Sequence, residues 1–202
     1  MKIICIGRNY GAHAKELGNE VPDKPVIFCK PDTALLKHNE PFYIPDFSKD
    51  IHHEIEVVVK IDKMGKSIAP QFAHKYYSEF TLGVDFTARD LQSELKSKGL
   101  PWELAKAFDH SAVVGDFLKI DGTDLNNYEF TLLKNNAVVQ QGNTKDMLFN
   151  IDAIISFVSH YFTLKTGDLI FTGTPAGVGA VSIGDCLIGK SGHVEFFNFE
   201  VK

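Results

Sequence analysis

The chain has 202 residues, of which 44% are hydrophobic and 23% charged, with a formal net charge of −5. This length allows one domain with an apolar core, or at most one domain with small appendages, and the composition is that of an ordinary soluble globular protein. The acidic balance differs from the clustered Lys and Arg of nucleic-acid-binding proteins, so we expect no nucleic-acid partner.

Short runs rich in β-branched and aromatic residues recur along the chain, often separated by Pro or Gly, which predicts strands. These strands are expected at Lys2–Ile6, Val26–Lys30, Glu54–Ile61, Phe80–Phe86, Phe130–Leu133, Asp168–Thr172 and Val194–Val201. Fewer segments show helical spacing, and we expect helices at Gly11–Gly18, Thr87–Lys98 and Asp146–Phe162. Because strands outnumber helices without regular alternation, the pattern predicts the α+β class. No repeat or linker divides the chain, so we expect a single domain over residues 1–202.

The three cysteines form no CxxC pair, and Cys5, Cys29 and Cys186 lie among apolar neighbours. This usage is typical of reduced thiols in a core, and it favours a reducing compartment. The apolar run after Lys2 is too short for a secretion signal or a membrane span. We therefore expect a cytoplasmic protein that does not associate with membranes.

Two carboxylates at alternate positions are the sharpest local feature of the sequence. Glu54 and Glu56 begin an apolar strand, where side chains at i and i+2 point to the same side. Crowded carboxylates repel unless a cation lies between them, and a hard divalent ion prefers oxygen ligands. A solvated polar strand face is the alternative that spacing alone leaves open.

A third carboxylate, Asp85, follows an apolar strand, where an unpaired charge is costly if it is buried. It could complete a triad of oxygen ligands with Glu54 and Glu56. From spacing alone, it could equally cap a helix that starts at Thr87.

Three further segments carry polar groups suited to catalysis. His13 and Glu16 are neighbours at i and i+3 on a helix, where the carboxylate could orient the imidazole as a general base or form only a surface pair. Lys106 stands among apolar residues, where it could stabilise an oxyanion or extend to solvent. The Gly-rich turn around Thr174 could bind a carboxylate, but it lacks the context of a dinucleotide site.

Together, these segments resemble the fumarylacetoacetate hydrolase family, in particular its small single-domain acylpyruvase branch. The resemblance rests on blocks in the family's order: Cys5-Ile6-Gly7-Arg8-Asn9-Tyr10 with His13 and Glu16, Phe28-Cys29-Lys30-Pro31, His53-Glu54-Ile55-Glu56, Asp85 through Gln92, Lys98 through Trp102 with Ala105-Lys106, and Gly167-Asp168 with Thr172 through Gly179. One departure is Ala107, which stands where the family often has Ser after the lysine.

The resemblance implies a mixed β-sandwich roll that is usually a homodimer. It further implies a metal bound by Glu54, Glu56 and Asp85, with Mg2+ expected and Mn2+ as an alternative. A lid helix within residues 1–20 would carry His13 and Glu16, and Lys106 would be a catalytic lysine. Arg89, Gln92, Thr174 and Lys30 fall where members of the family line the substrate pocket.

The activity expected from this resemblance is metal-dependent hydrolysis of the C–C bond of acylpyruvates, which are small anionic 2-oxo acids. Water activated by His13 and Glu16 would attack the C4 carbonyl, and pyruvate would leave as its enolate. The same site would support decarboxylation or tautomerisation of oxaloacetate, or isomerisation or decarboxylation of dienoic diacids. A metal- or metabolite-binding domain without catalysis is a further alternative, which His13, Glu16 and Lys106 disfavour.

Overall fold

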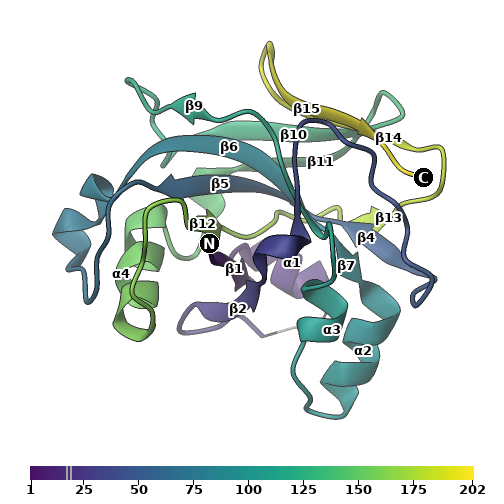
Figure 1. Cartoon of the computed structure of the whole chain (residues 1–202), viewed down its shortest axis with the longest axis horizontal. Coiled ribbons are helices and arrows are strands. Elements are labelled where there is room, and N and C mark those ends of the chain that lie inside the picture. The colour runs from purple at the N-terminus through teal and green to yellow at the C-terminus, as the bar shows by residue number, and fades with distance from the viewer. Residues whose placement is uncertain (17, 19) are drawn as a thin grey trace.

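A mixed sheet of eight strands forms the centre of the computed structural model, which describes residues 1–16, 18 and 20–202 (Figure 1). The strand order is β2-β1-β12-β5-β6-β8-β3, and β9 pairs with β6 beside this path. Two strand pairs, β1 with β12 and β3 with β8, are parallel, and the others are antiparallel. In chain order the strands are β1 (Ile3–Gly7), β2 (Val26–Lys30), β3 (Leu35–Leu36), β5 (Ile55–Ile61), β6 (Tyr77–Asp85), β8 (Ala112–Val114), β9 (Leu118–Lys119) and β12 (Leu169–Phe171).

Two smaller sheets complete the strand architecture. One has four antiparallel strands in the order β11-β10-β14-β15, and Figure 1 shows its strands β14 and β15 above the long strands β5 and β6. The other has three strands in the order β13-β4-β7. Their strands are β4 (Ile51–His53), β7 (Thr87–Ala88), β10 (Glu129–Lys134), β11 (Ala137–Asn143), β13 (Gly179–Ala180), β14 (Cys186–Ser191) and β15 (Val194–Glu200).

Four α-helices lie on the other side of β5 and β6 in Figure 1, counted within the described part of the chain. They are α1 (Gly11–Glu16), α2 (Arg89–Ser97), α3 (Glu103–Lys106) and α4 (Ile151–Tyr161). Short 3-10 helices occupy Asp32–Ala34, Pro70–Lys75 and Thr144–Asp146. No helix of the described residues is long and apolar enough to cross a bilayer.

The position of the site follows from the two faces of β5, a run of β-branched residues that suits a pleated sheet. On one face, Ile55, Val57 and Val59 belong to the main core, together with Phe130 and Phe197 of the four-stranded sheet. On the other face, Val58 joins a smaller cluster that contains Ile3, Cys5 and Phe171. Because successive side chains alternate, Glu56 shares the face of Val58 and points away from the main core.

The fold confirms the expected α+β class, and all seven expected strand regions contain strands. The three helices expected from the sequence were each longer than the observed helices α1, α2 and α4. The helix α4 begins only at Ile151, after Asn150, whose side chain caps it by accepting a hydrogen bond from the backbone N–H of Ala153 at 2.9 Å. Residues 87–88 form β7 instead of the first helical turn, and α1 ends at Glu16, while Leu17 lies outside the described residues.

Candidate metal and substrate site

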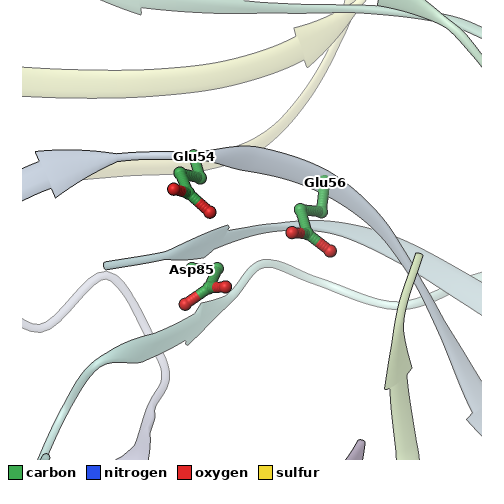
Figure 2. Close-up of side chains that lie close together, drawn as sticks. All are labelled: Glu54, Glu56 and Asp85. Atoms are coloured by element: carbon green, nitrogen blue, oxygen red, sulfur yellow. The ribbon is translucent and has the colours of Figure 1, made fainter. Parts of the chain in front are cut away.

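Three buried carboxylates meet where β4, β5 and β6 come together (Figure 2). Glu54 lies between β4 and β5, Glu56 is within β5, and Asp85 ends β6. The backbone N–H of Asp85 donates to the carbonyl of Glu54 at 2.8 Å, which places these two residues opposite each other on adjacent strands. One oxygen of each carboxylate lies within 4.8 Å of the others, and all three residues are at most 5% exposed. The solvated strand face is therefore wrong. The helix-capping role for Asp85 is also wrong, because α2 begins after Ala88 and has no side-chain cap.

Three cations surround this triad. Lys106 Nζ lies 2.7 Å from both Glu54 Oε2 and Asp85 Oδ2. Arg89 donates to Glu54 Oε1 at 2.6 Å, and Lys30 Nζ lies 2.6 Å from Asp85 Oδ1. Since Lys106 is only 3% exposed, it does not extend to solvent. The inner site thus brings three carboxylates against three cations.

The two glutamates respond to this field in opposite directions. Burial would raise the pKa of Glu54, but the charges of Lys106 and Arg89 outweigh it and hold that pKa well below its ordinary value. Burial and the neighbouring Asp85 raise the pKa of Glu56 well above its ordinary value, against a 2.7 Å hydrogen bond from the N–H of Gly173. Glu56 therefore carries the uncompensated repulsion of the triad.

The donor set fits a hard divalent cation. Carboxylate oxygens are the ligands that Mg2+ and Mn2+ prefer, and three on one side leave positions for water or substrate. Asp85 Oδ1 has the ion pair with Lys30 Nζ at 2.6 Å but no hydrogen bond of good geometry, since that ammonium donates to the carbonyls of Phe86 and Ser111 and to the Ser111 hydroxyl. Within the described residues, this triad is the one cluster of three or more acidic, His or Cys side chains with such spacing.

The helix α1 carries His13 into the same pocket. His13 is 5% exposed, lines the pocket with the three carboxylates, and its Nδ1 lies 3.1 Å from Glu16 Oε2. Glu16 also accepts a hydrogen bond from the N–H of Gly177, 3.0 Å from Oε1. Asn9 fixes the chain before the helix, since its side-chain amide donates to the carbonyl of Thr172 at 2.7 Å. The pair is therefore held against the Gly-rich turn and is not a free surface pair.

The four residues expected to line the substrate pocket lie at different depths. Arg89, Gln92 and Thr174 line the pocket, and Arg89 donates to Gln92 Oε1 at 2.6 Å. Lys30 lies behind Asp85, and its contacts are with protein groups. The hydroxyl of Ser111 donates to the carbonyl of Lys106 at 2.8 Å and contacts Lys30, so a hydroxyl supports this lysine although residue 107 is Ala.

A buried amide, Gln140 of β11, supports the pocket and was not anticipated from the sequence. Its Oε1 accepts from the N–H of Ile55 at 3.0 Å, which assigns Nε2 as the donor to Thr174 Oγ1 at 2.9 Å and to the carbonyl of Pro175 at 3.0 Å. The same Oε1 lies 3.0 Å from His53 Nδ1. Because Thr174 Oγ1 accepts this hydrogen bond, its own proton is available to donate elsewhere. No spacing rule relates Gln140 to residues this far away in the chain.

Comparisons with known proteins relate the whole chain to a set of enzymes. A family model described as fumarylacetoacetate (FAA) hydrolase C-terminal matches residues 2–197. The mitochondrial oxaloacetate decarboxylase of Dictyostelium discoideum is 44% identical over 188 residues, which cover 92% of this chain and 86% of the relative. The mitochondrial oxaloacetate tautomerase of Bos taurus is 42% identical over 184 residues, covering 91% and 83%. A crystal structure of fumarylpyruvate hydrolase from Pseudomonas aeruginosa, in complex with Mn2+ and pyruvate, superimposes with a TM-score of 0.94 at 32% identity and covers 100% of this chain and 89% of its own.

Proposed function

The chain belongs to the fumarylacetoacetate hydrolase family, and we propose that it is a metal-dependent enzyme that interconverts the keto and enol forms of oxaloacetate. The names of the relatives from Dictyostelium discoideum and Bos taurus support this substrate. They favour the alternative expected from the sequence over acylpyruvate hydrolysis.

The observation that carries the proposal is the charge balance of the inner site. Lys30, Arg89 and Lys106 each contact a carboxylate of the triad, so three positive groups face three negative ones. A divalent cation on the triad would leave the site with two excess positive charges. That excess matches oxaloacetate, which is a dianion at neutral pH.

The triad would hold Mg2+ or Mn2+ through Glu54, Glu56 and Asp85. When bound, such an ion supplies Lewis acidity toward the oxygen of a 2-oxo group. Lys106 adds to this as a fixed cation. Burial would lower its pKa, but Asp85 and Glu54 raise the pKa above the ordinary lysine value. In this proposal, Lys106 would stabilise negative charge on the substrate oxygen, and the role of the base falls to another residue.

His13 is the group suited to move the proton at C3 of oxaloacetate. Its Nδ1 contacts Glu16, so the carboxylate holds the imidazole in the tautomer with Nδ1–H and leaves Nε2 as the acceptor. The hydroxyl of Thr174, whose oxygen accepts from Gln140, can donate to a substrate carboxylate. The chain thus provides a base, a fixed positive charge and a donor in one pocket.

Hydrolysis of acylpyruvates is the second candidate. It is favoured by the likeness to the fumarylpyruvate hydrolase that binds Mn2+ and pyruvate. In that reaction, His13 would accept a proton from the attacking water instead of from C3. Decarboxylation of oxaloacetate is the remaining outcome: its C3–C4 bond would break to release CO2, the electron pair would form the enolate of pyruvate, and no base is needed.

The test uses protein stripped with EDTA and then supplied with Mg2+ or Mn2+. Loss of the enol of oxaloacetate is followed by ultraviolet absorbance, pyruvate release is measured separately, and cleavage of acetylpyruvate is run in parallel. We expect metal-dependent tautomerisation to exceed the other two rates. Full activity in the stripped protein would contradict the metal site, and a dominant rate with acetylpyruvate would establish the second candidate.

Three further expectations stay predictions. The homodimer rests on the family resemblance, and sedimentation at micromolar concentration would test it. Cytoplasmic location is also a prediction, since relatives from Dictyostelium discoideum and Bos taurus are named as mitochondrial. The single domain over residues 1–202 is consistent with the span of the family match and could be tested by limited proteolysis.

A further inference from the structure

The side-chain amide of Gln140 lies directly behind the pocket wall. Gln140 belongs to β11 and is 2% exposed, and Thr174, which it contacts on the pocket side, is 3% exposed. Thr174 lines the pocket with the carboxylate triad, whereas Gln140 does not. No step of the proposed reaction is carried out by Gln140 itself.

The orientation of this amide is fixed by two backbone groups that each have only one possible role. The N–H of Ile55 can only donate, and it donates to Gln140 Oε1 at 3.0 Å. The carbonyl of Pro175 can only accept, and it accepts from Gln140 Nε2 at 3.0 Å. Turning the amide by 180° would break both hydrogen bonds and leave two buried backbone groups unpaired. The amide therefore has one stable orientation.

His53 adds a second constraint on the same oxygen. Its Nδ1 lies 3.0 Å from Gln140 Oε1, and because that oxygen carries no proton, Nδ1 is the protonated nitrogen of the ring. His53 is 1% exposed, so water does not compete for this hydrogen bond. Gln140 Oε1 thus accepts from two donors, which use both of its lone pairs.

The second proton of the amide determines what the hydroxyl of Thr174 can do. Gln140 Nε2 donates one proton to the carbonyl of Pro175 and the other to Thr174 Oγ1, at 2.9 Å. A hydroxyl that accepts from an N–H must direct its own proton elsewhere, and Thr174 Oγ1 donates to no other group of the described residues. Since Thr174 lines the pocket, that proton is available to a ligand bound there.

Close packing holds β11 against the Gly-rich turn around this hydrogen bond. A Cβ at Gly177 would lie 2.6 Å from the carbonyl oxygen of Val139, and a Cβ at Gly142 would lie 2.8 Å from Pro175 Cγ. The strand and the turn are therefore in direct contact on both sides of Gln140. Packing as well as hydrogen bonding sets the position of the amide.

We propose that Gln140 is a positioning residue for the substrate carboxylate, which acts through Thr174 by making its hydroxyl donate into the pocket. His53 supports this role by holding the amide in its one orientation. The inference rests on the proposed function for the presence of a carboxylate beside the 2-oxo group of the substrate. It makes Gln140 a determinant of substrate affinity although its side chain touches neither the triad nor the substrate.

Gln140→Glu reverses the polarity of this contact at nearly constant shape. The new side chain still offers one oxygen to the N–H of Ile55. Its other oxygen either is ionised and can only accept, or carries one proton, which goes to the carbonyl of Pro175 because a carbonyl cannot donate. In both states the hydroxyl of Thr174 donates to residue 140, and its proton is lost to the substrate.

The test measures kcat and KM for oxaloacetate in the full chain saturated with Mg2+, together with calorimetric binding of pyruvate. We expect Gln140→Glu to raise KM and the Kd of pyruvate about 10- to 150-fold, the range of one hydrogen bond to a charged group, with kcat within about threefold. Thr174→Val, which removes the hydroxyl at constant shape, should have the same effect. In the double variant the two effects should not add, because the second change removes a contact that is already lost.

Two further variants separate positioning from folding. Gln141→Glu is the matched control, because Gln141 is an exposed position of the same strand, and it should leave KM unchanged. If Gln140→Glu does not fold, Gln140→Met supplies the same cycle with Thr174→Val. It should raise KM about 2- to 12-fold when the Thr174 hydroxyl is present and not when it is absent. Additive losses in either cycle, or an unchanged KM in both Gln140 variants, would overturn the proposal.

Failure of the proposed function gives a different result. If the wild-type protein does not turn over oxaloacetate, the function is wrong, while the binding of pyruvate still tests Gln140. An equal Kd of pyruvate in wild type and Gln140→Glu would refute the positioning role even if turnover is normal. Absence of pyruvate binding to the wild type would also overturn it, because the role requires a carboxylate in the pocket.

Discussion

Replacing Glu16 with Ala should distinguish two roles of α1. One is to orient His13 as a base, and the other is to close the pocket by holding the helix against the Gly-rich turn. The carboxylate of Glu16 makes two contacts, one with His13 Nδ1 at 3.1 Å and one with the N–H of Gly177 at 3.0 Å. The first orients the imidazole, and the second ties α1 to the Gly-rich turn. Glu16→Ala removes both contacts but leaves Lys106 and the triad unchanged.

The losses of activity expected from removing these two contacts differ in size. A hydrogen bond to a charged group contributes about 1.5–3 kcal/mol, and the lower value applies to this partly exposed carboxylate. Losing it would reduce the ratio of closed to open pocket roughly tenfold, and every reaction would slow by at most about that factor. General-base assistance contributes a further 10²–10⁴-fold, roughly, and only to reactions that need a base. Tautomerisation should therefore fall about 10²- to 10⁵-fold, while decarboxylation of oxaloacetate should fall by at most about tenfold.

The assay measures both reactions on one sample of Mg2+-loaded protein, by enol absorbance and by pyruvate release. Their ratio removes errors in protein concentration and in the fraction of closed pocket. Lys15→Ala, an exposed position on the same helix, is the control and should leave the ratio unchanged. Equal losses of the two activities in Glu16→Ala would refute the base, and His13 would then only close the pocket.

Three further changes test the surroundings of the site. Glu56→Gln should abolish metal binding, as measured by calorimetry. In the metal-free protein the same change should raise the melting temperature by about 2–4 °C for each kcal/mol of relieved repulsion. Because the pKa of Glu56 is raised in the folded state, this gain in stability should appear above the ordinary glutamate pKa and grow as pH rises. Gln140→Leu should cost about 1–3 kcal/mol in urea unfolding, because it leaves buried partners unpaired, whereas exposed Gln141→Leu should change stability by less than about 0.5 kcal/mol. Gly173→Ala should destabilise by about 1–3 kcal/mol in the same assay, since φ is +102° and an added Cβ would lie 2.7 Å from Asn9 Cβ.

The carboxylate triad could be predicted from the sequence because strand geometry is local and regular. Glu54 and Glu56 are two residues apart at the start of an apolar strand, so they had to share a side. Asp85 required a long-range pairing, and the register that places it opposite Glu54 is not evident from spacing alone. Resemblance to a family supplied that step. The long strands were also predictable, because runs such as that of β5 (Ile55–Ile61) hold β-branched residues at several successive positions.

The short strands and helix starts could not be predicted as readily. Two-residue strands such as β7 and β13 have no periodicity to detect, and they exist because long-range partners supply their hydrogen bonds. The start of α4 was placed too early because Met147 continues the apolar spacing. Met147 instead forms an isolated β-bridge with Tyr10, and this tertiary contact overrides the local helix propensity. The role of Gln140 could not be predicted for the same reason, because its side chain accepts a hydrogen bond from the N–H of Ile55, 85 positions away in the chain.

The inner site shows how the fold accommodates six charged groups at its centre. Burying an unpaired charge is costly, but a charge in good contact with an opposite one and with hydrogen-bond partners can be retained. Glu54 and Asp85 meet this condition through Lys106, Arg89 and Lys30, and the low pKa of Glu54 reflects it. Glu56 does not, because its one described hydrogen-bond donor is a backbone N–H and its neighbours include two carboxylates. The repulsion is therefore concentrated on one ligand, where a divalent cation would relieve it, and the paired cations hold the other two ligands in place before that cation binds.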